Sequence, residues 1–443
     1  MRQPIRPVLL ALWLVAAAAA ANAQLISTGV AVAPSYNTFL PPTAGGSYID
    51  PVFGTTIQRV SNALGMHNAD RGGFLNWISN EYSTATPFNN DNSRFILVHQ
   101  SYFALYDGAG YYLRDLPFEI SASSEPRWSR SDLVTLYYHS GNRLKAYNTE
   151  TGQTTVVHTF SEYKTIDGAG EMDISLDGDH FVFAGDSQEV FVYQISTDLK
   201  SAALRLGGLK FDSIYITPDN HVSVTWLKSG TGRYTGIELF DTDMTFLRQL
   251  AHAGGHMHYT RDLNGDEVLL WTNSNDAQPI ANCENGIVKI RLADASQTCL
   301  LQLDWSLAVH ISAPDGNGYV FVDTEAPRNP DPDSPAWKPY TNEILQIKLD
   351  GSTVTRLAHH RSRAVNSYNW EPKVTVSRDG SRLLFMSDFD LQAIDGAPTE
   401  YGDTYLLALD PTPCPERKRY RVWRSSTVRT DSKAATPLRC LAE

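Results

Sequence analysis

The sequence predicts an all-β fold, a seven-bladed β-propeller closed by an N-terminal strand. The first reason lies at 374–387, where two apolar runs flank a Ser-Arg-Asp-Gly turn, the pattern of two antiparallel strands joined by a tight hairpin. The second is that this unit recurs at intervals of roughly 40 to 60 residues, the period of blades that must stack to bury both faces. The third is Thr55–Ser61, a strand without a hairpin partner.

Seven copies of the unit follow one another, two of them degenerate. The last blade supplies only three strands, Lys373–Val376, Leu383–Met386 and Thr404–Leu409. We therefore expect Thr55–Ser61 to pair beside Thr404–Leu409 and close the ring. The copies begin at Phe88, Pro126, Asp173, Tyr215, Tyr259, His310 and Val374.

The chain outside the repeats divides into three parts. Residues 1–23 combine two arginines, an apolar stretch and a small-residue end, the pattern of a secretory signal peptide cleaved before Gln24, with a retained membrane anchor as the alternative. Residues 24–54 are expected to form a proline-rich surface leader, 55–410 one propeller domain, and 411–443 a basic, solvated strap. This organisation predicts a secreted or periplasmic protein, and no later stretch is long and apolar enough to span a bilayer.

Charge limits the partners. The formal net charge of −12 becomes −14 once Arg2 and Arg6 are removed, which argues against nucleic acid because phosphate neutralisation needs a basic surface. A local basic pocket for an anionic polysaccharide or oligosaccharide is still compatible with this charge. We expect a monomer with no membrane partner.

Four cysteines in an exported chain suggest two disulfides. The most economical pairing joins Cys283 to Cys299 across an apparent hairpin and Cys414 to Cys440 in the tail. Zinc ligation by Cys283 and Cys299 with a histidine is the alternative.

Several blades place candidate binding residues at one mouth of the channel. His99 and His139 occupy the turns between the second and third strands of blades one and two, on the mouth where blades are entered. Arg233 lies in the matching turn of blade four. Blade six inserts a stiff proline-rich loop, 326–340, whose Trp337 can offer a stacking face to a sugar, with a solvated insert as the alternative.

Blade entries also suggest a metal site. His258 and His310 each lie two residues before the Ser or Thr of the repeat, so they occupy equivalent positions on adjacent blades, where imidazoles can share a metal or a substrate. A hydrogen-bonded structural role is the alternative for either one. Asn366, Asn369 and Glu371 enter the next blade beside His310. One imidazole, one carboxylate and amide oxygens suit a divalent manganese, calcium or magnesium ion better than structural zinc.

The repeat, His310 before an Ile-Ser strand, and Asn366-x-x-Asn369-x-Glu371 before Pro372 resemble the propeller-type oligogalacturonate lyases, within the TolB-like extracytoplasmic β-propellers. The propeller ulvan lyases are more loosely similar. In the oligogalacturonate lyases the metal ligands are a histidine entering one blade and Gln-x-x-His-x-His entering the next. Both histidines of that second motif are replaced here, by Asn369 and Glu371.

The resemblance implies metal-assisted β-elimination on a uronate-containing glycan. By order and approximate spacing, the family's catalytic histidine and arginine fall on His256, the base for the C5 proton, and on Arg233, a partner of the carboxylate. Tyr215 and His139 are second candidates, because the ulvan lyases use histidine and tyrosine with an arginine. His99, His258 and Trp337 are the expected substrate contacts.

The sequence is therefore compatible with two alternative functions. One is a secreted or periplasmic polysaccharide lyase, and the other is a non-catalytic propeller that binds a glycan or a protein partner, since a fold does not fix a function. Paired carboxylates for glycoside hydrolysis are also compatible with Glu125, Glu171 and Asp173, which enter blades. The sequence contains no Gly-x-Ser-x-Gly elbow and no His-Glu-x-x-His.

Overall fold

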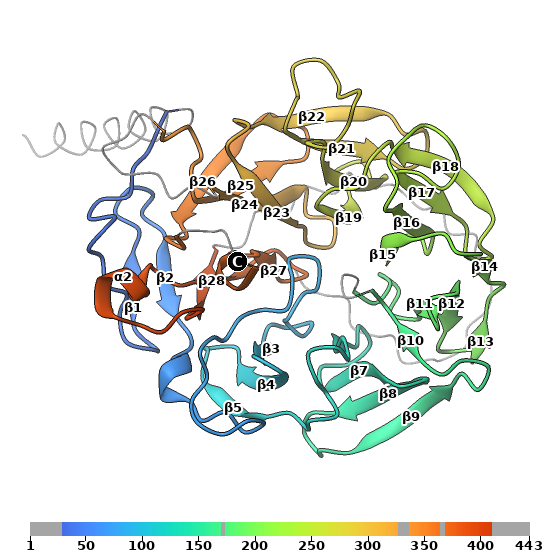
Figure 1. The fold of residues 1–443 in the computed structure, drawn as a ribbon, viewed down its shortest axis with the longest axis horizontal. Coiled ribbons are helices and arrows are strands. Elements are labelled where there is room, and N and C mark those ends of the chain that lie inside the picture. The colour runs from blue at the N-terminus through green and yellow to red at the C-terminus, as the bar shows by residue number, and fades with distance from the viewer. Residues whose placement is uncertain (1–28, 170–172, 327–335, 364–367, 410–443) are drawn as a thin grey trace, which may run out of the picture.

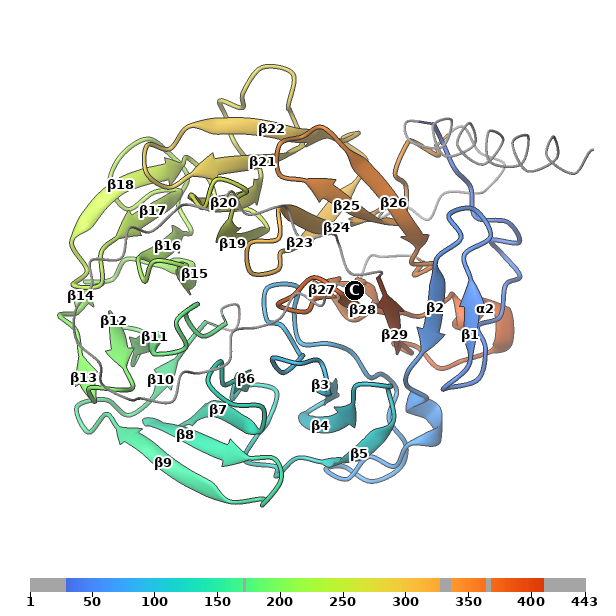
Figure 2. The same ribbon diagram turned by 180° about the vertical axis from the view of Figure 1, so that it is seen from behind.

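The computed structural model describes residues 29–169, 173–326, 336–363 and 368–409. Seven antiparallel sheets stand around a central channel, and the strands of each sheet are ordered from the axis to the rim (Figure 1; Figure 2, from behind). The predicted seven-bladed β-propeller is confirmed. Helix in the described residues is limited to α2 (Leu391–Asp395) and two 3-10 turns, η1 (Ala63–Gly65) and η2 (Tyr368–Trp370), and no described helix is long and apolar enough to cross a membrane.

Blades one to four follow the chain in order, each built from neighbouring hairpins. Blade one has β3 (Arg94–His99), β4 (Tyr102–Asp107) and β5 (Tyr112–Asp115), and blade two has β6 (Arg127–Trp128), β7 (Thr135–Ser140), β8 (Arg143–Asn148) and β9 (Thr154–Thr159). Blade three has β10 (Ile166–Asp167), β11 (His180–Gly185), β12 (Glu189–Gln194), β13 (Leu199–Lys200) and β14 (Leu204–Arg205). Blade four has β15 (Phe211–Ile216), β16 (Val222–Trp226), β17 (Ile237–Phe240) and β18 (Phe246–Ala251).

The last three blades complete the ring. Blade five has β19 (Met257–Arg261), β20 (Glu267–Thr272), β21 (Gly286–Arg291) and β22 (Gln297–Gln302), and blade six has β23 (Ala308–Ser312), β24 (Tyr319–Glu325), β25 (Glu343–Lys348) and β26 (Val354–His359). Blade seven runs β27 (Thr375–Val376), β28 (Arg382–Ser387), β29 (Asp403–Ala408), β2 (Thr56–Arg59) and β1 (Ser47–Ile49). Ile57 lies opposite Leu407 in an antiparallel pair, so the predicted closure is confirmed. The end of the predicted leader adds a fifth strand, β1, beside β2.

The repeated turn explains the hairpins. In the last copy, Ser377 Oγ donates to Asp379 Oδ1 at 2.7 Å and accepts from the amide of Arg382 at 3.0 Å. Gly380 has φ +79°, the left-handed region that glycine adopts without strain. The side chains of the Ser-x-Asp-Gly sequence therefore satisfy the turn that reverses the chain.

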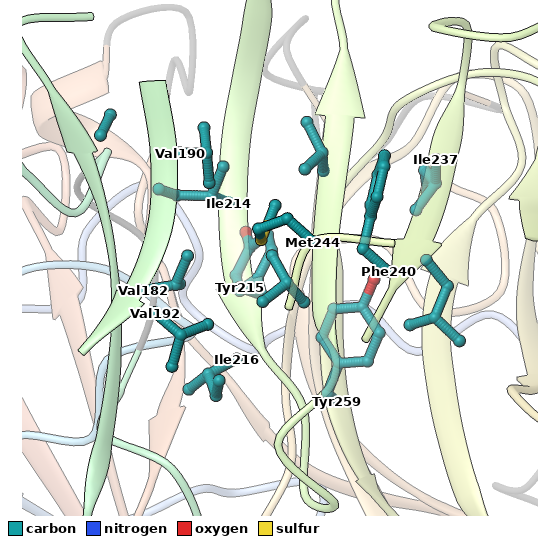
Figure 3. Packing of buried hydrophobic residues seen from close by; sticks show 14 of the residues in the cluster. Val182, Val190, Val192, Ile214, Tyr215, Ile216, Ile237, Phe240, Met244 and Tyr259 are labelled. Atoms are coloured by element: carbon teal, nitrogen blue, oxygen red, sulfur yellow. The ribbon is translucent and has the colours of Figure 1, made fainter. Parts of the chain in front are cut away.

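The core lies between blades rather than within one sheet. Figure 3 shows Val182, Val190 and Val192 of blade three against Ile214 and other apolar side chains of blade four. All five residues of β16 are buried, because a strand covered on both faces has no solvent side. Each fully buried aliphatic side chain contributes roughly 1.5–3 kcal/mol, so stacking of the blades stabilises the ring.

A disulfide and the leader fasten the rim. Cys283 bonds Cys299 with the Cα atoms 5.8 Å apart, which confirms that predicted pair, whereas Cys414 and Cys440 lie outside the described residues. Buried basic side chains tie the leader to blades six and seven: His359 contacts Ala31 O at 3.1 Å, and Arg361 donates to Pro34 O at 3.2 Å. The leader is therefore held by hydrogen bonds to its carbonyl oxygens.

Residues 76–87 run inside the ring. Asn80 Nδ2 donates to Lys373 O of the blade-seven entry at 2.6 Å, and Glu81 pairs with Arg127 of blade two at 2.6 Å. Thr86 Oγ1 donates to Val376 O at 2.9 Å. This segment therefore links blades seven and two, the two neighbours of blade one, from inside the ring.

Ion pairs close the end of the channel formed by the first-to-second-strand turns. Arg378 of blade seven lies 3.1 Å from Asp173 of blade three. Arg130 of blade two lies between Asp173 and Asp315 of blade six. The pairs Arg378–Asp173 and Arg130–Asp315 join blades that are not neighbours in the ring, so these two contacts cross the axis. We call these four residues the closing cluster.

Candidate functional site

The opposite, blade-entry end of the channel brings two predicted histidines together. His256, just before β19, and His310, on β23, stack with ring centroids 4.3 Å apart and an interplanar angle of 25°. Tyr82 from the channel segment meets both rings edge-on, 5.4 Å from His310 and 6.5 Å from His256. The sequence predicted His258 as the equivalent of His310 on the adjacent blade. The structure instead stacks His310 against His256, and His258 lines another cavity.

Backbone contacts fix the tautomer of His256. A Cβ on Gly255 would lie 2.5 Å from the Thr272 carbonyl oxygen, so only glycine lets the loop pack this closely against β20. The packed loop aims Nδ1 of His256 at the Val309 carbonyl oxygen. Because a carbonyl only accepts, Nδ1 carries the proton and Nε2 has a free lone pair; among the described residues, no hydrogen bond engages Nε2.

The environment keeps His256 neutral. The side chain of His256 is open to the pocket, but the surrounding protein removes much of its water. This burial, and then the positive charge of His310, lower the pKa of His256. A neutral imidazole with one free ring nitrogen is able to accept a proton near neutral pH.

Two buried carboxylates hold His310. Register places His310 opposite Asp323, and Glu325 follows two residues later on the same face of β24. Nδ1 of His310 lies 2.9 Å from Glu325 and 3.6 Å from Asp323. Burial alone would lower the pKa of His310, but the charges of Glu325 and Asp323 outweigh it and raise that pKa. Burial raises the pKa of Glu325.

The other nitrogen of His310 faces a third carboxylate. Nε2 lies 3.8 Å from Oε2 of Glu371, which follows η2 and is partly exposed. Two atoms bound to one cation at roughly 2.0–2.6 Å each can stand up to about 5 Å apart, so this pair fits a bound cation. Asp323, Glu325 and His310 also have potential ligand atoms within 4.8 Å of one another. The donor set, one imidazole and carboxylates, therefore fits a divalent metal.

Lys373 adds a buried cation beside these carboxylates. Its side chain donates to Tyr368 O at 3.1 Å and stands 3.7 Å from the Tyr368 ring centroid. Burial lowers the pKa of Lys373 to about 8, against the charges of Glu371, Glu325 and Asp323.

A pocket of about 630 Å³ opens beside His256, between blades four and five. Tyr215 and Tyr82 line it together with His256. Arg233 does not: its Nε donates to Glu238 at 2.9 Å, and its guanidinium lies 3.6 Å from the Phe246 ring centroid on the outer strand. The predicted arginine thus points toward the rim of blade four.

The remaining predicted residues lie elsewhere. His99 is fully buried and contacts the Tyr106 hydroxyl at 2.8 Å, and Trp337 is 4% exposed and packs edge-on against Tyr36, so neither offers an open face to a sugar. His258 lines a small cavity next to the closing cluster. His139 contacts Glu125 at 3.4 Å in another part of the ring. Asn369 lies in η2 beside Glu371, whereas Asn366 and Glu171 fall outside the described residues.

Asp323, Glu325 and Tyr82 were not among the site residues predicted from the sequence. A signal for the two carboxylates was present. The Ser312 hairpin fixes the register of β23 and β24, which sets Asp323 opposite His310, and strand alternation puts Glu325 on the same face.

Comparison with known proteins supports the fold. No protein-family model matches the chain, and no curated protein sequence does. Among solved structures, the chain is similar to an oligogalacturonate lyase in complex with manganese (TM-score 0.56, 13% identity, 84% of this chain and 97% of that chain). It is also similar to an oligogalacturonate lyase from Vibrio parahaemolyticus (TM-score 0.56, 10% identity, 82% and 96%). These likenesses confirm the predicted resemblance for the fold.

Proposed function

We propose that the protein is a secreted or periplasmic polysaccharide lyase that cleaves a uronate-containing glycan by β-elimination. The observation that carries the proposal is the His256–His310 stack, in which one ring keeps a free nitrogen and the other is held by carboxylates. The likeness to two oligogalacturonate lyases supports it at the level of architecture.

His256 is the proposed base. Its Nε2 takes the proton from C5 of the uronate, the C–H electron pair forms the C4–C5 double bond, and the C4–O bond breaks. The departing oxygen takes a proton from a hydroxyl group in the same pocket, for which Tyr215 and Tyr82 are the candidates. The proposed base and both candidate proton donors therefore line the same pocket.

His310 and Glu371 are the proposed metal ligands, with Asn366 or Asn369 as further donors. When bound, a divalent manganese, calcium or magnesium ion would neutralise the uronate carboxylate as charge builds up on it. Glu325 and Asp323 occupy Nδ1 of His310, which orients the ring and leaves Nε2 toward Glu371. Because Glu238 engages Arg233, the cation rather than this arginine would neutralise the uronate carboxylate.

A non-catalytic propeller that binds a glycan or a protein partner is the second candidate. The position of Arg233 favours it, because the pocket beside His256 lacks the arginine that the resemblance implied. Such a protein would bind an anionic oligosaccharide without cleaving it.

The test is ultraviolet absorbance of the unsaturated product during incubation with a panel of uronate polymers, with and without added Mn²⁺. We expect product from the wild type, at least a ~100-fold loss in Glu371→Gln, and partial recovery at high Mn²⁺. Glu284→Gln, a half-buried carboxylate next to the Cys283–Cys299 disulfide of blade five, is the control. Binding of a polymer without any unsaturated product would favour the second candidate.

A further inference from the structure

A second group of potential ligands stands in blades two and three. We propose that Glu125, His139 and Asp167 form a site for a divalent transition-metal ion, with Zn²⁺ as the probe of choice. The potential ligand atoms of these residues all lie within 4.8 Å of one another. This site is separate from the His256 pocket and does not depend on the proposed lyase activity.

Three different segments supply the ligands. His139 lies near the end of β7, Glu125 precedes β6, and Asp167 ends β10 at the entry to blade three. Nε2 of His139 is 3.4 Å from Oε2 of Glu125. That nitrogen is buried and has no hydrogen-bond partner among the described residues. A buried ring nitrogen aimed at carboxylates is the arrangement that a metal ion satisfies.

Arg127 and Lys145 pair with other carboxylates, although Glu125 also acts on Arg127: burial alone would lower the pKa of Arg127, but the charges of Glu81 and then Glu125 raise it. Arg127 beside Glu125 directs both terminal nitrogens to Glu81, at 2.6 and 3.3 Å. Lys145 pairs with Glu119. The two carboxylates of the proposed site would balance the double charge of the ion, with His139 as a neutral ligand.

The backbone holds Glu125 in place. Glu125 has φ +48°, a conformation that costs a non-glycine residue energy. A Cβ on Gly168 would lie 2.2 Å from Oε2 of Glu125, so glycine at this position lets the carboxylate approach the residue next to Asp167. The strained backbone and the close packing against Gly168 therefore both restrict the position of the Glu125 carboxylate.

An entry path is present. His139 and Asp167 line a pocket of about 360 Å³ with several hydroxyl groups, among them Ser124 and Thr165. Asp167 is exposed, so an ion can reach the site from solvent and keep water in its remaining positions. The imidazole favours zinc or a similar ion over calcium, which takes oxygen ligands.

The test is a Zn²⁺ titration of the full chain after removal of bound metal, followed by isothermal calorimetry and elemental analysis. We expect the wild type to bind one more equivalent of Zn²⁺ than His139→Ala. Two further variants should each lower the affinity for this extra Zn²⁺ ion at least ~10-fold. Asp167→Asn is an exposed change that cannot disturb the core, and Gly168→Ala keeps all three ligands but displaces Glu125. Ca²⁺ should not compete.

His158→Ala is the matched control, because His158 pairs with a single carboxylate, Asp198, and should leave the stoichiometry unchanged. A difference of one equivalent is independent of any ion bound near His310. Equal Zn²⁺ stoichiometry and affinity in the wild type, His139→Ala and Asp167→Asn would overturn the proposal.

Discussion

The two ends of the channel are built from the same hairpins, yet their ionisable groups are arranged differently. At the turn end, Arg378 and Arg130 are each shared between carboxylates and backbone carbonyls. At the entry end, Nε2 of His256 has no hydrogen-bond partner in the described part of the chain, and Glu371 faces His310 across 3.8 Å. Pairing fixes the first end, whereas the second has unused donor and acceptor capacity.

Chain geometry accounts for this division. The turns after the first strands are short and meet on the axis, so opposite blades can be joined there by ion pairs. The blade entries arrive from the rim through longer segments and tolerate glycine-rich loops such as the one before His256. We therefore expect substitutions at the turn end to change stability and those at the entry end to change activity.

Replacement of Arg378 should have the largest effect on stability. Arg378→Ala removes hydrogen bonds to Trp128 O and Asn90 and leaves Arg130 as the ion-pair partner of Asp173 among the described residues. Loss of one partner from a buried ion pair costs about 3–5 kcal/mol, which denaturant unfolding would measure. Activity per folded molecule should stay within about twofold. A variant that unfolds like the wild type would remove the structural role from the closing cluster.

Replacement of His256 should show the opposite pattern. His256→Ala should lower the elimination rate at least ~100-fold, the usual contribution of a general base, while the free energy of unfolding changes by less than about 1 kcal/mol because the side chain is exposed. His180→Ala, a histidine paired with Asp177 at the turn end, is the matched control and should retain activity. Full activity of His256→Ala would exclude it as the base.

The contrast between the ends also shows what the sequence predicts. The hairpins, the closing strand and the Cys283–Cys299 bond follow from local patterns, so they were predictable. The repeat predicted His258 beside His310, whereas the structure stacks His256 against His310, because the path of the loop before β19 is not part of the repeat. Contacts across the axis, such as Arg378 with Asp173, depend on the diameter of the closed ring, which no local pattern contains. Trp337 is buried by the distant Tyr36, and this too is non-local.

Low pH should lower the free energy of unfolding through Asp173 at the turn end, by less than the Arg378→Ala substitution does. Burial alone would raise the pKa of Asp173, but the charges of Arg378, Arg130 and Arg127 outweigh it and lower that pKa. In the unfolded chain an aspartate titrates near pH ~3.9. Because the folded value is lower, the stabilisation from Asp173 is fully present above about pH 4 and is lost as the pH falls through the folded pKa.

Asp173→Asn tests this pH dependence. The difference in unfolding free energy between wild type and Asp173→Asn should be constant from pH 7 to about pH 5 and should shrink below about pH 4, by ~1.4 kcal/mol for each unit of pKa shift. Urea titrations at several pH values would measure it. Asp219→Asn, which breaks an ion pair with Arg261 at a partly exposed surface turn, is the control and should change stability by less than ~1 kcal/mol at any pH. If the difference in unfolding free energy between wild type and Asp173→Asn does not vary with pH, the arginines position Asp173 without stabilising its charge. Hydrogen bonds alone would then make the turn end rigid.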